Sequence, residues 1–198
     1  MAAGALLDKW KNVPAAVKQF ILRGLIILIT WKILYLAFLL PTRLLDKPLS
    51  HSVGAGTAWI LNIYTHTHDY IDKVEHGNEP TDNGLTDMPL DNVYFHQHIV
   101  VSIEDTCNGL ELFVLYAGFI VCMPAALRRK VIFIISGVIL IYMVNVVRCA
   151  WVAYIILYYP KYADFAHHYV FTFVVYGVII ALWLIFSKKV KQAHAETE

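Results

Sequence analysis

Three residue types that together carry out acyl transfer occur far apart in the chain: Cys107, Arg148 and the pair His167 and His168. A thiolate attacks carbonyl carbons, an imidazole exchanges protons near neutral pH, and a guanidinium binds a carboxylate, a thiolate or a developing oxyanion. Asp164 precedes the two histidines by three and four residues, so on a helix it lies beside either one and is able to orient its imidazole. These residues form one site only if the elements that carry them bring them together.

The residues around Cys107 act on its thiol in opposite directions. Glu104 and Asp105 disfavour the thiolate because like charges repel, so a cationic partner such as Arg148 or a charged histidine is needed. Thr106 or Asp105 is placed to cap the helix that follows, and the dipole of that helix favours a thiolate at its N-terminus.

Each of these residues also has a plain structural interpretation. Cys107 suits a small buried position, and Arg148, one turn after Asn145, suits a snorkelling anchor at the end of an apolar helix. The late histidines suit a membrane interface rich in tyrosine. Cys149 is expected at the same depth as Cys107, so a disulfide between the two is a further alternative.

Two other histidine pairs, His66 with His68 and His96 with His98, would each place both imidazoles on one face of a strand. Such a pair is able to bind a metal ion. No cysteine or carboxylate completes a recognised metal-binding spacing around them, so we assign no metal site. A metal-handling membrane protein built on these pairs is an alternative function.

The composition places these residues in a membrane protein. Of the 198 residues, 59% are hydrophobic and 16% are charged, and the mean hydropathy is +0.57. Soluble domains have about 45–50% apolar and about 25% charged residues, so the excess is too large for an ordinary core. The net charge of +1 gives no reason to expect a nucleic-acid partner, and three cysteines cannot form a disulfide framework.

The apolar segments predict an all-α polytopic membrane protein that forms a single domain over residues 1–198. About four firm transmembrane helices are expected, at about 20–40, 108–127, 131–150 (continuing to 159 as an option) and 169–187. Lys32 lies within the first of them and would snorkel or face a neighbouring helix.

Two segments between the spans need a separate account. Residues 53–64 are apolar but short, which is typical of an interfacial or re-entrant helix. Residues 65–106 form a polar outer loop, and the β-branched and aromatic residues of 93–104 favour a short strand within it.

The basic residues predict the orientation. Lysines precede the first span, a basic triplet at 128–130 is expected to mark a tight turn, and a lysine cluster follows the last span. All three groups fall on one side of four spans, which is then the cytoplasmic side, with both termini. Cys107, Arg148 and the late histidines then share the outer face.

Three segments, in this order, resemble the exosortase/archaeosortase family of multi-span membrane cysteine transpeptidases: DTCNGLELFVLYAGFI at 105–120, NVVR at 145–148 and HHYVF at 167–171. The family pattern is a cysteine followed closely by a small residue and Gly-Leu, an Asn-x-x-Arg, and a histidine at the start of a late span. The resemblance covers roughly residues 93–186. Many members have about eight spans, so the chain is most similar to the short Bacteroidetes-type variants.

On this resemblance, Cys107 corresponds to the nucleophile, Arg148 to the arginine of the family and His167 to its histidine. The supporting candidates are His168, Asp164, Asn145 and Asn108.

The resemblance implies a membrane-embedded cysteine protease or transpeptidase of the bacterial cytoplasmic (inner) membrane, with its site on the periplasmic face. Its substrates would be exported proteins with a C-terminal sorting tail: a motif, a transmembrane helix and a basic cluster. The enzyme would cleave this tail and transfer the protein to an acceptor such as a lipid or a glycan. Membrane lipid is a further partner, and no metal ion or organic cofactor is expected. A non-enzymatic membrane assembly or binding protein is the competing class.

Overall fold

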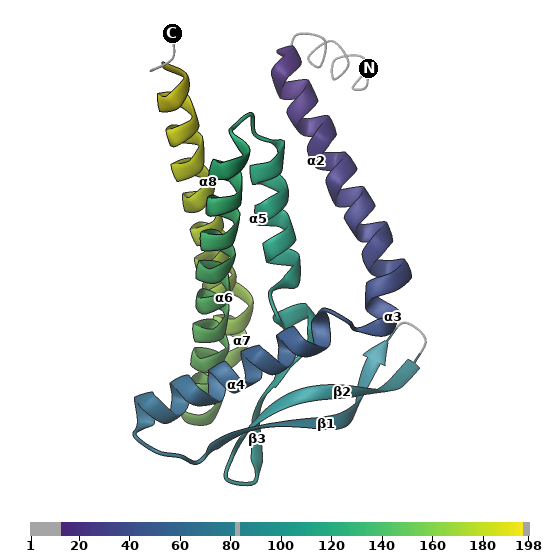
Figure 1. The fold of residues 1–198 in the computed structure, drawn as a ribbon. Coiled ribbons are helices and arrows are strands. Elements are labelled where there is room, and N and C mark those ends of the chain that lie inside the picture. Colours follow the sequence, from purple (N-terminus) through teal and green to yellow (C-terminus); the bar gives the residue numbers. More distant parts are fainter. Residues whose placement is uncertain (1–12, 82–83, 196–198) are drawn as a thin grey trace, which may run out of the picture.

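The computed structural model describes residues 13–81 and 84–195. It is mostly helical, as predicted, with one small sheet at one end of the helices (Figure 1). Among the described residues, three segments are long and apolar enough to cross a membrane: Val17–Thr42, Leu127–Tyr158 and Phe171–Val190. A shorter apolar helix covers Leu110–Cys122. The chain is therefore an integral membrane protein, and the second of the four predicted spans is the short one.

The first span consists of three consecutive segments: α2 (Ala15–Leu34), a π-helical turn (Tyr35–Leu39) and α3 (Leu40–Thr42). Pro41 has no N–H to donate to the preceding turn, which accounts for the irregular geometry just before it. The span ends at Arg43, whose φ of 46° is left-handed and turns the chain sideways.

Pro124 shortens the second apolar helix. α5 covers Leu110–Cys122, about 20 Å, whereas the sequence predicted a span reaching residue 127. A residue before proline is driven out of the α region, and Met123 is extended, with ψ 140°. α6 (Leu127–Tyr158) begins after this turn. The basic triplet at 128–130 therefore lies in the first turn of α6 and not in the connection.

α5 and α6 pack closely at Gly137. A Cβ atom there would lie 2.2 Å from the ring of Tyr116, so no side chain fits, and small residues at helix contacts are typical of membrane bundles. Tyr116 is fully buried, and its hydroxyl donates a 2.8 Å hydrogen bond to the carbonyl oxygen of Phe133. α8 (Phe171–Ala195) completes the bundle with buried Val175, Ile179 and Phe186.

A series of short turns joins α6 to α8. It consists of a 3-10 turn (Pro160–Tyr162), α7 (Ala163–Phe165) and a π-helical turn (Ala166–Val170). The last predicted span thus begins as an irregular helix before it becomes regular.

α4 (Asp46–Thr65) lies across the lower end of the bundle and over the sheet (Figure 1). It contains the predicted segment 53–64 and begins earlier, at Asp46. Its orientation in Figure 1 is that of a helix crossing the bundle end rather than a span. One stripe of the helix is buried: Asp46, Ser50, Val53, Gly54, Thr57, Ala58 and Leu61.

The sheet is antiparallel, in the order β1-β2-β3, with strands Tyr70–Thr81, Gly84–Phe95 and His98–Ile103. The strand predicted in the outer loop is confirmed, in β3 and the end of β2. The sheet extends further than the sequence indicated, through β1 and the rest of β2. The polar composition of β1 and of the first part of β2 gave no indication of strands. Their buried positions are covered by α4 and α6, which lie elsewhere in the chain.

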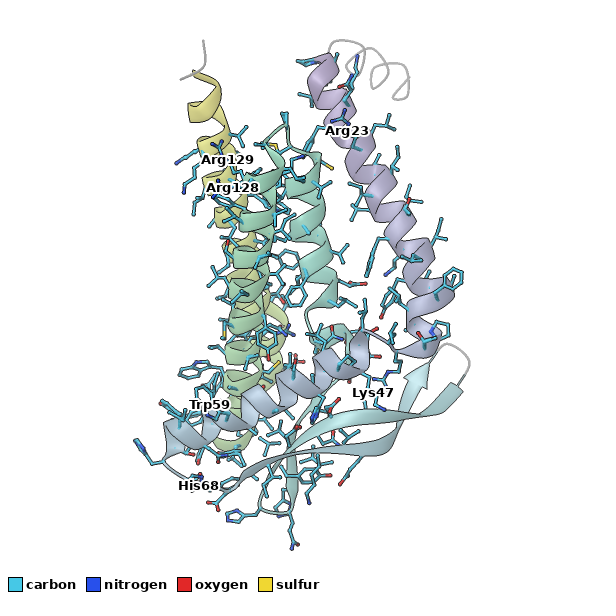
Figure 2. All side chains as sticks on the ribbon, in the orientation of Figure 1. Arg23, Lys47, Trp59, His68, Arg128 and Arg129 are labelled. Atoms are coloured by element: carbon cyan, nitrogen blue, oxygen red, sulfur yellow. The ribbon has the colours of Figure 1, made fainter. Side chains whose placement is uncertain are left out.

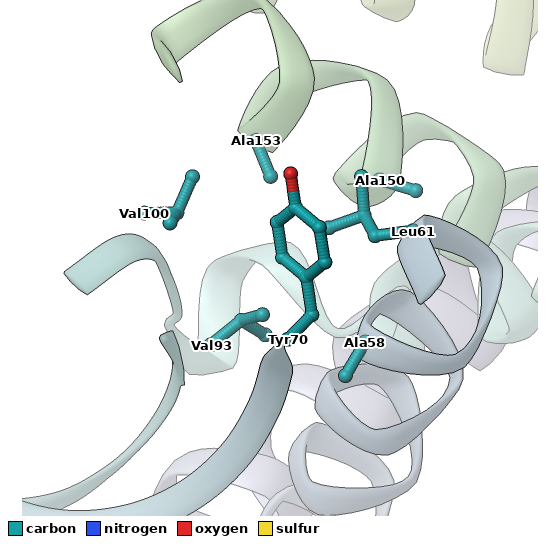
Figure 3. Close-up of a cluster of buried hydrophobic side chains, with 7 residues drawn as sticks. All are labelled: Ala58, Leu61, Tyr70, Val93, Val100, Ala150 and Ala153. Carbon is teal, nitrogen blue, oxygen red and sulfur yellow. The ribbon is translucent and has the colours of Figure 1, made fainter. Parts of the chain in front are cut away.

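A cluster of buried residues joins the sheet to α4 and α6. The ring of Tyr70 lies among small and branched side chains from these helices and from β2 and β3 (Figure 3). Asn62 of α4 fixes this strand, since its amide donates to the carbonyl oxygen of Tyr70 at 2.9 Å and accepts from its N–H at 3.0 Å. The members of the cluster are Ala58, Leu61, Tyr70, Val93, Val100, Ala150 and Ala153.

The two ends of the bundle differ in composition. Arg23, Arg128 and Arg129 lie toward the end where both termini lie, whereas Lys47, Trp59 and His68 lie at the end with α4 and the sheet (Figure 2). Arg129 also donates to the carbonyl oxygen of Lys189 at 3.2 Å, so the basic triplet and the C-terminal lysine cluster share one end of the bundle. Lys9 and Lys11, before the first span, lie outside the described residues.

Candidate active site

Cys107 and Arg148 meet at the end of the bundle that carries the sheet. Cys107 closes a 3-10 turn (Asp105–Cys107) after β3, and Arg148 lies in α6. Nη2 of Arg148 donates to Sγ of Cys107 at 3.8 Å, and both residues are half-buried. Arg148 is thus the cationic partner that the acidic surroundings of Cys107 require.

Asn145 joins the two residues through its side-chain amide. It is fully buried; its Nδ2 donates to the carbonyl oxygen of Cys107 at 2.9 Å, and its Oδ1 accepts from Nη1 of Arg148 at 3.2 Å. Gly109 allows the loop to pass this close, because its φ is 92° and a Cβ atom would lie 3.3 Å from Nδ2 of Asn145. The backbone of Cys107 and the guanidinium are therefore positioned by the same amide.

The side chain that accepts a hydrogen bond from the first turn of α5 belongs to Asn108, and not to Thr106 or Asp105 as the sequence suggested. Asn108 Oδ1 accepts from the N–H of Leu110 at 2.9 Å, which satisfies one of the free donors of the first turn. Its Nδ2 donates to Asp46 at 2.8 Å and to Ser50 at 3.4 Å, both fully buried in α4. The loop before α5 is thus tied to α4.

Arg43 neutralises Asp105, which the sequence suggested would oppose the thiolate. Its Nε and Nη2 donate to the two carboxylate oxygens of Asp105 at 2.8 and 2.5 Å, and the side chains are 12% and 16% exposed. Ser50 adds a bond to Asp105 at 3.3 Å. Bidentate pairs of this kind fix geometry as well as charge.

Sequence reasoning missed the contribution of α4 and of the residue before it. Arg43, Asp46 and Ser50 all contact the 105–108 loop. One sequence signal could have indicated this contribution. Asp46 and Ser50 are four residues apart and are followed by apolar residues at the same helical spacing, so they belong to the buried face of a helix.

Arg148 still has capacity to bind an anion. Its Nε is buried and has no hydrogen-bond partner among the described residues, although a guanidinium carries five N–H donors. A cavity of about 30 Å³ lies between Cys107, Arg148 and Cys149. It has about the volume that one water molecule occupies in the liquid.

A larger cavity of about 570 Å³ opens between α2, α5 and α8. Apolar residues such as Leu28, Leu115 and Val175 line it, and Arg148 and Thr106 also border it. Lys32 faces α5 across this cavity and forms a 2.9 Å ion pair with Glu111. The lysine of the first span therefore faces a neighbouring helix, one of the two alternatives expected for it.

His167 and His168 lie in the π-helical turn before α8. Their side chains lie outside what the structure describes, so their assignment stays a prediction. Asp164 lies in α7 and is exposed. The structure thus brings together Cys107 and Arg148 with Asn145 and Asn108.

Two alternative interpretations of the sequence concern a Cys107–Cys149 disulfide and a metal site on the histidine pairs. Cys107, Cys122 and Cys149 are all free thiols. Neither of the pairs His66 with His68 and His96 with His98 belongs to a group of three potential metal ligands among the residues that the structure describes.

A bundle of membrane-length helices with a thiol–guanidinium pair at one end defines an integral membrane protein with a candidate cysteine site. The family model described as transmembrane exosortase (Exosortase_EpsH) matches residues 20–186. The chain belongs to this family, as its three motifs predicted. Neither a curated protein nor a solved structure matches the chain.

Proposed function

We propose that the protein is a membrane cysteine transpeptidase that cleaves the C-terminal sorting tail of exported proteins and transfers the cleaved protein to an acceptor. The observation that carries this proposal is the 3.8 Å contact between Cys107 Sγ and Arg148 Nη2, in a chain of the exosortase family. A cysteine beside a fixed cation is the arrangement expected of a reactive thiol.

In the proposed reaction, the Cys107 thiolate attacks the scissile carbonyl carbon, and a C–S bond and a tetrahedral oxyanion form. The C–N bond then breaks, leaving a thioester on Cys107. His167, or His168 in its place, takes the thiol proton and returns a proton to the leaving amine, with Asp164 orienting the imidazole. An acceptor nucleophile or water then attacks the thioester and releases the protein.

Arg148 has two roles in this scheme. It stabilises the thiolate before attack and the oxyanion after it, because its fork presents several N–H donors to one region. Its unpartnered Nε and the neighbouring small cavity support this role. Asn145 and Asn108 hold the loop and the guanidinium in position.

The large cavity is the proposed place for the apolar segment of the substrate tail. It lies between three apolar helices and is bordered by Arg148, so a helix lying there would bring its end close to Cys107. α2 is poorly covered by the rest of the bundle, since none of the residues in its most apolar window is buried. A substrate helix would then be held between α2 and α8.

The distribution of charge supports the proposed location. If the end with Arg128 and Arg129 faces the cytoplasm of a bacterial inner membrane, the candidate site faces the periplasm. A scissile bond just outside the transmembrane helix of a substrate would then be at the depth of Cys107.

The test is processing of a reporter protein that carries a motif, a transmembrane helix and a basic cluster at its C-terminus. Cys107→Ala should abolish processing, and a thioester between reporter and enzyme should be trapped in the wild type by acid quench and mass spectrometry. Cys122→Ala is the matched control, because Cys122 is a buried thiol at the opposite end of α5. Normal processing by Cys107→Ala would instead favour the non-enzymatic assembly class.

A further inference from the structure

Three potential metal ligands converge where α4 crosses the sheet. They are His51 of α4, Asp72 of β1 and Asp91 of β2, and their ligand atoms all lie within 4.8 Å of one another. His51 Nδ1 is 3.2 Å from Asp72 Oδ2 and 3.3 Å from Asp91 Oδ1. None of the three belongs to the candidate active site.

The fold presents both carboxylates on the face of the sheet that α4 covers. Asp72 pairs with Val93 across the β1–β2 ladder, and Asp91 lies two residues before Val93. Side chains two residues apart on a strand share one face, so Asp72 and Asp91 are diagonal neighbours. His51 extends from the helix above them.

Gly54 makes room for one of these carboxylates. It lies three residues after His51, on the same side of α4, and a Cβ atom there would lie 2.7 Å from Asp72 Oδ1. Any larger residue would displace the carboxylate. The backbone of α4 is thus shaped around Asp72.

The cluster carries more negative charge than its neighbours compensate. The side chains of Asp72 and Asp91 are 10% and 3% exposed, and burial raises the pKa of both carboxyls above the ordinary value. The imidazole of His51 faces both carboxylates, and Asp72 Oδ1 is buried without a hydrogen-bond partner among the residues that the structure describes. Nearby Arg43 forms its bidentate pair with Asp105.

The two distances from His51 Nδ1 also suit a tetrahedral ion. Zinc bonds of about 2.0–2.2 Å to nitrogen and oxygen place tetrahedral ligand atoms about 3.3–3.5 Å apart. The distance to Asp72 Oδ2 is 3.2 Å, and the distance to Asp91 Oδ1, which is also a hydrogen bond, is 3.3 Å. Both are longer than charge-assisted hydrogen bonds of about 2.7–2.9 Å.

We propose that His51, Asp72 and Asp91 form a binding site for one divalent transition-metal cation, with Zn²⁺ as the best-fitting ion. The cation neutralises the two carboxylates and lies between His51 Nδ1, Asp72 Oδ2 and Asp91 Oδ1. The His51 side chain is 58% exposed, so the ion enters from solvent and water completes its coordination. Its role is to fasten α4 to the β1–β2 hairpin. Ser50, beside His51, contacts the Asp105 and Asn108 side chains of the active-site loop.

The test uses the full chain purified in detergent, stripped with a chelator and titrated with Zn²⁺. Wild-type protein should bind one equivalent, measured by elemental analysis after gel filtration, and its melting temperature should rise with Zn²⁺. Co²⁺ in place of Zn²⁺ should give the visible absorption of a tetrahedral site. His51→Ala and Asp72→Asn should each weaken binding by at least about tenfold. His51→Ala is the key variant, since the His51 side chain is mostly exposed and its truncation leaves the buried core intact.

A variant lacking His66 and His68 is the matched control, because it removes two imidazoles near the end of the same helix. It should keep the full equivalent of metal. The proposal is overturned if the stripped wild type binds no stoichiometric cation, or if His51→Ala binds as tightly as wild type. Loss of binding in the control alone would also overturn it, and would assign the metal to the histidine pair. None of these measurements depends on transpeptidase activity.

Discussion

Replacing Asn145 with alanine removes two hydrogen bonds at the centre of the candidate site. One runs to the carbonyl oxygen of Cys107 and the other comes from the guanidinium of Arg148. A neutral hydrogen bond contributes about 1 kcal/mol and one to a charged group about 1.5–3 kcal/mol. The sum is about 2.5–4 kcal/mol. If all of it is felt in the transition state, kcat/KM for reporter processing falls by about 70- to 900-fold.

Asn62 provides a matched control for this experiment. It also makes two hydrogen bonds through its amide, both to the backbone of Tyr70, away from the site. Asn62→Ala should lower the melting temperature in detergent without changing the rate at which Cys107 reacts with iodoacetamide. Asn145→Ala should change both quantities. An Asn145→Ala enzyme that processes the reporter within about threefold of the wild-type rate would refute the positioning role of this amide.

Three further predictions concern the loop, the ion pair and the buried carboxylates. Gly109→Ala should destabilise the protein by about 1–2 kcal/mol, because its φ is 92°. Gly24→Ala is the control and should leave the stability unchanged, because no atom of the described residues lies within 4 Å of its added Cβ. Thermal unfolding in detergent compares the two variants. Arg43→Ala should lower the free energy of unfolding by about 3–5 kcal/mol, because it leaves the largely buried Asp105 carboxylate without its cation. In the double variant Arg43→Ala with Asp105→Ala, urea unfolding should show that part of this loss is recovered. Metal-stripped protein should lose stability as the pH rises from 3.8 through the raised pKa values of Asp72 and Asp91, since the folded state then binds more protons than the unfolded state. His51, Arg43 and Asp105 also face these carboxyls, so the slope is measured as the difference between wild type and Asp72→Asn; equal slopes would contradict the assignment.

The sequence predicted the apolar helices and the shared depth of Cys107 and Arg148 because both depend on regular spacing. Arg148 lies 21 residues after the start of α6 at Leu127, which is about 31 Å of helical rise and about the thickness of the hydrocarbon layer. Topology alone therefore placed the guanidinium at the depth of Cys107.

The remaining features depend on contacts between distant segments. The sequence of β1 does not alternate between apolar and polar residues strongly enough to indicate a strand. This strand is held instead by α4 and by the buried cluster around Tyr70. Asp46 and Ser50 are ordinary polar residues until the 105–108 loop packs on them. The end of α5, in contrast, could have been predicted from the sequence, because Pro124 disfavours helical geometry in the residue before it.

The brevity of α5 has a consequence for the surrounding lipid. A helix of about 20 Å does not match a hydrocarbon layer of about 30 Å, so either the bilayer thins beside it or one of its ends lies below the membrane surface. If that end is the one at Leu110, the backbone that leads into α5 is shielded from water and needs partners within the protein. The amides of Asn108 and Asn145 supply two of them. These two asparagines then do for the loop what headgroups and water do at an ordinary helix end.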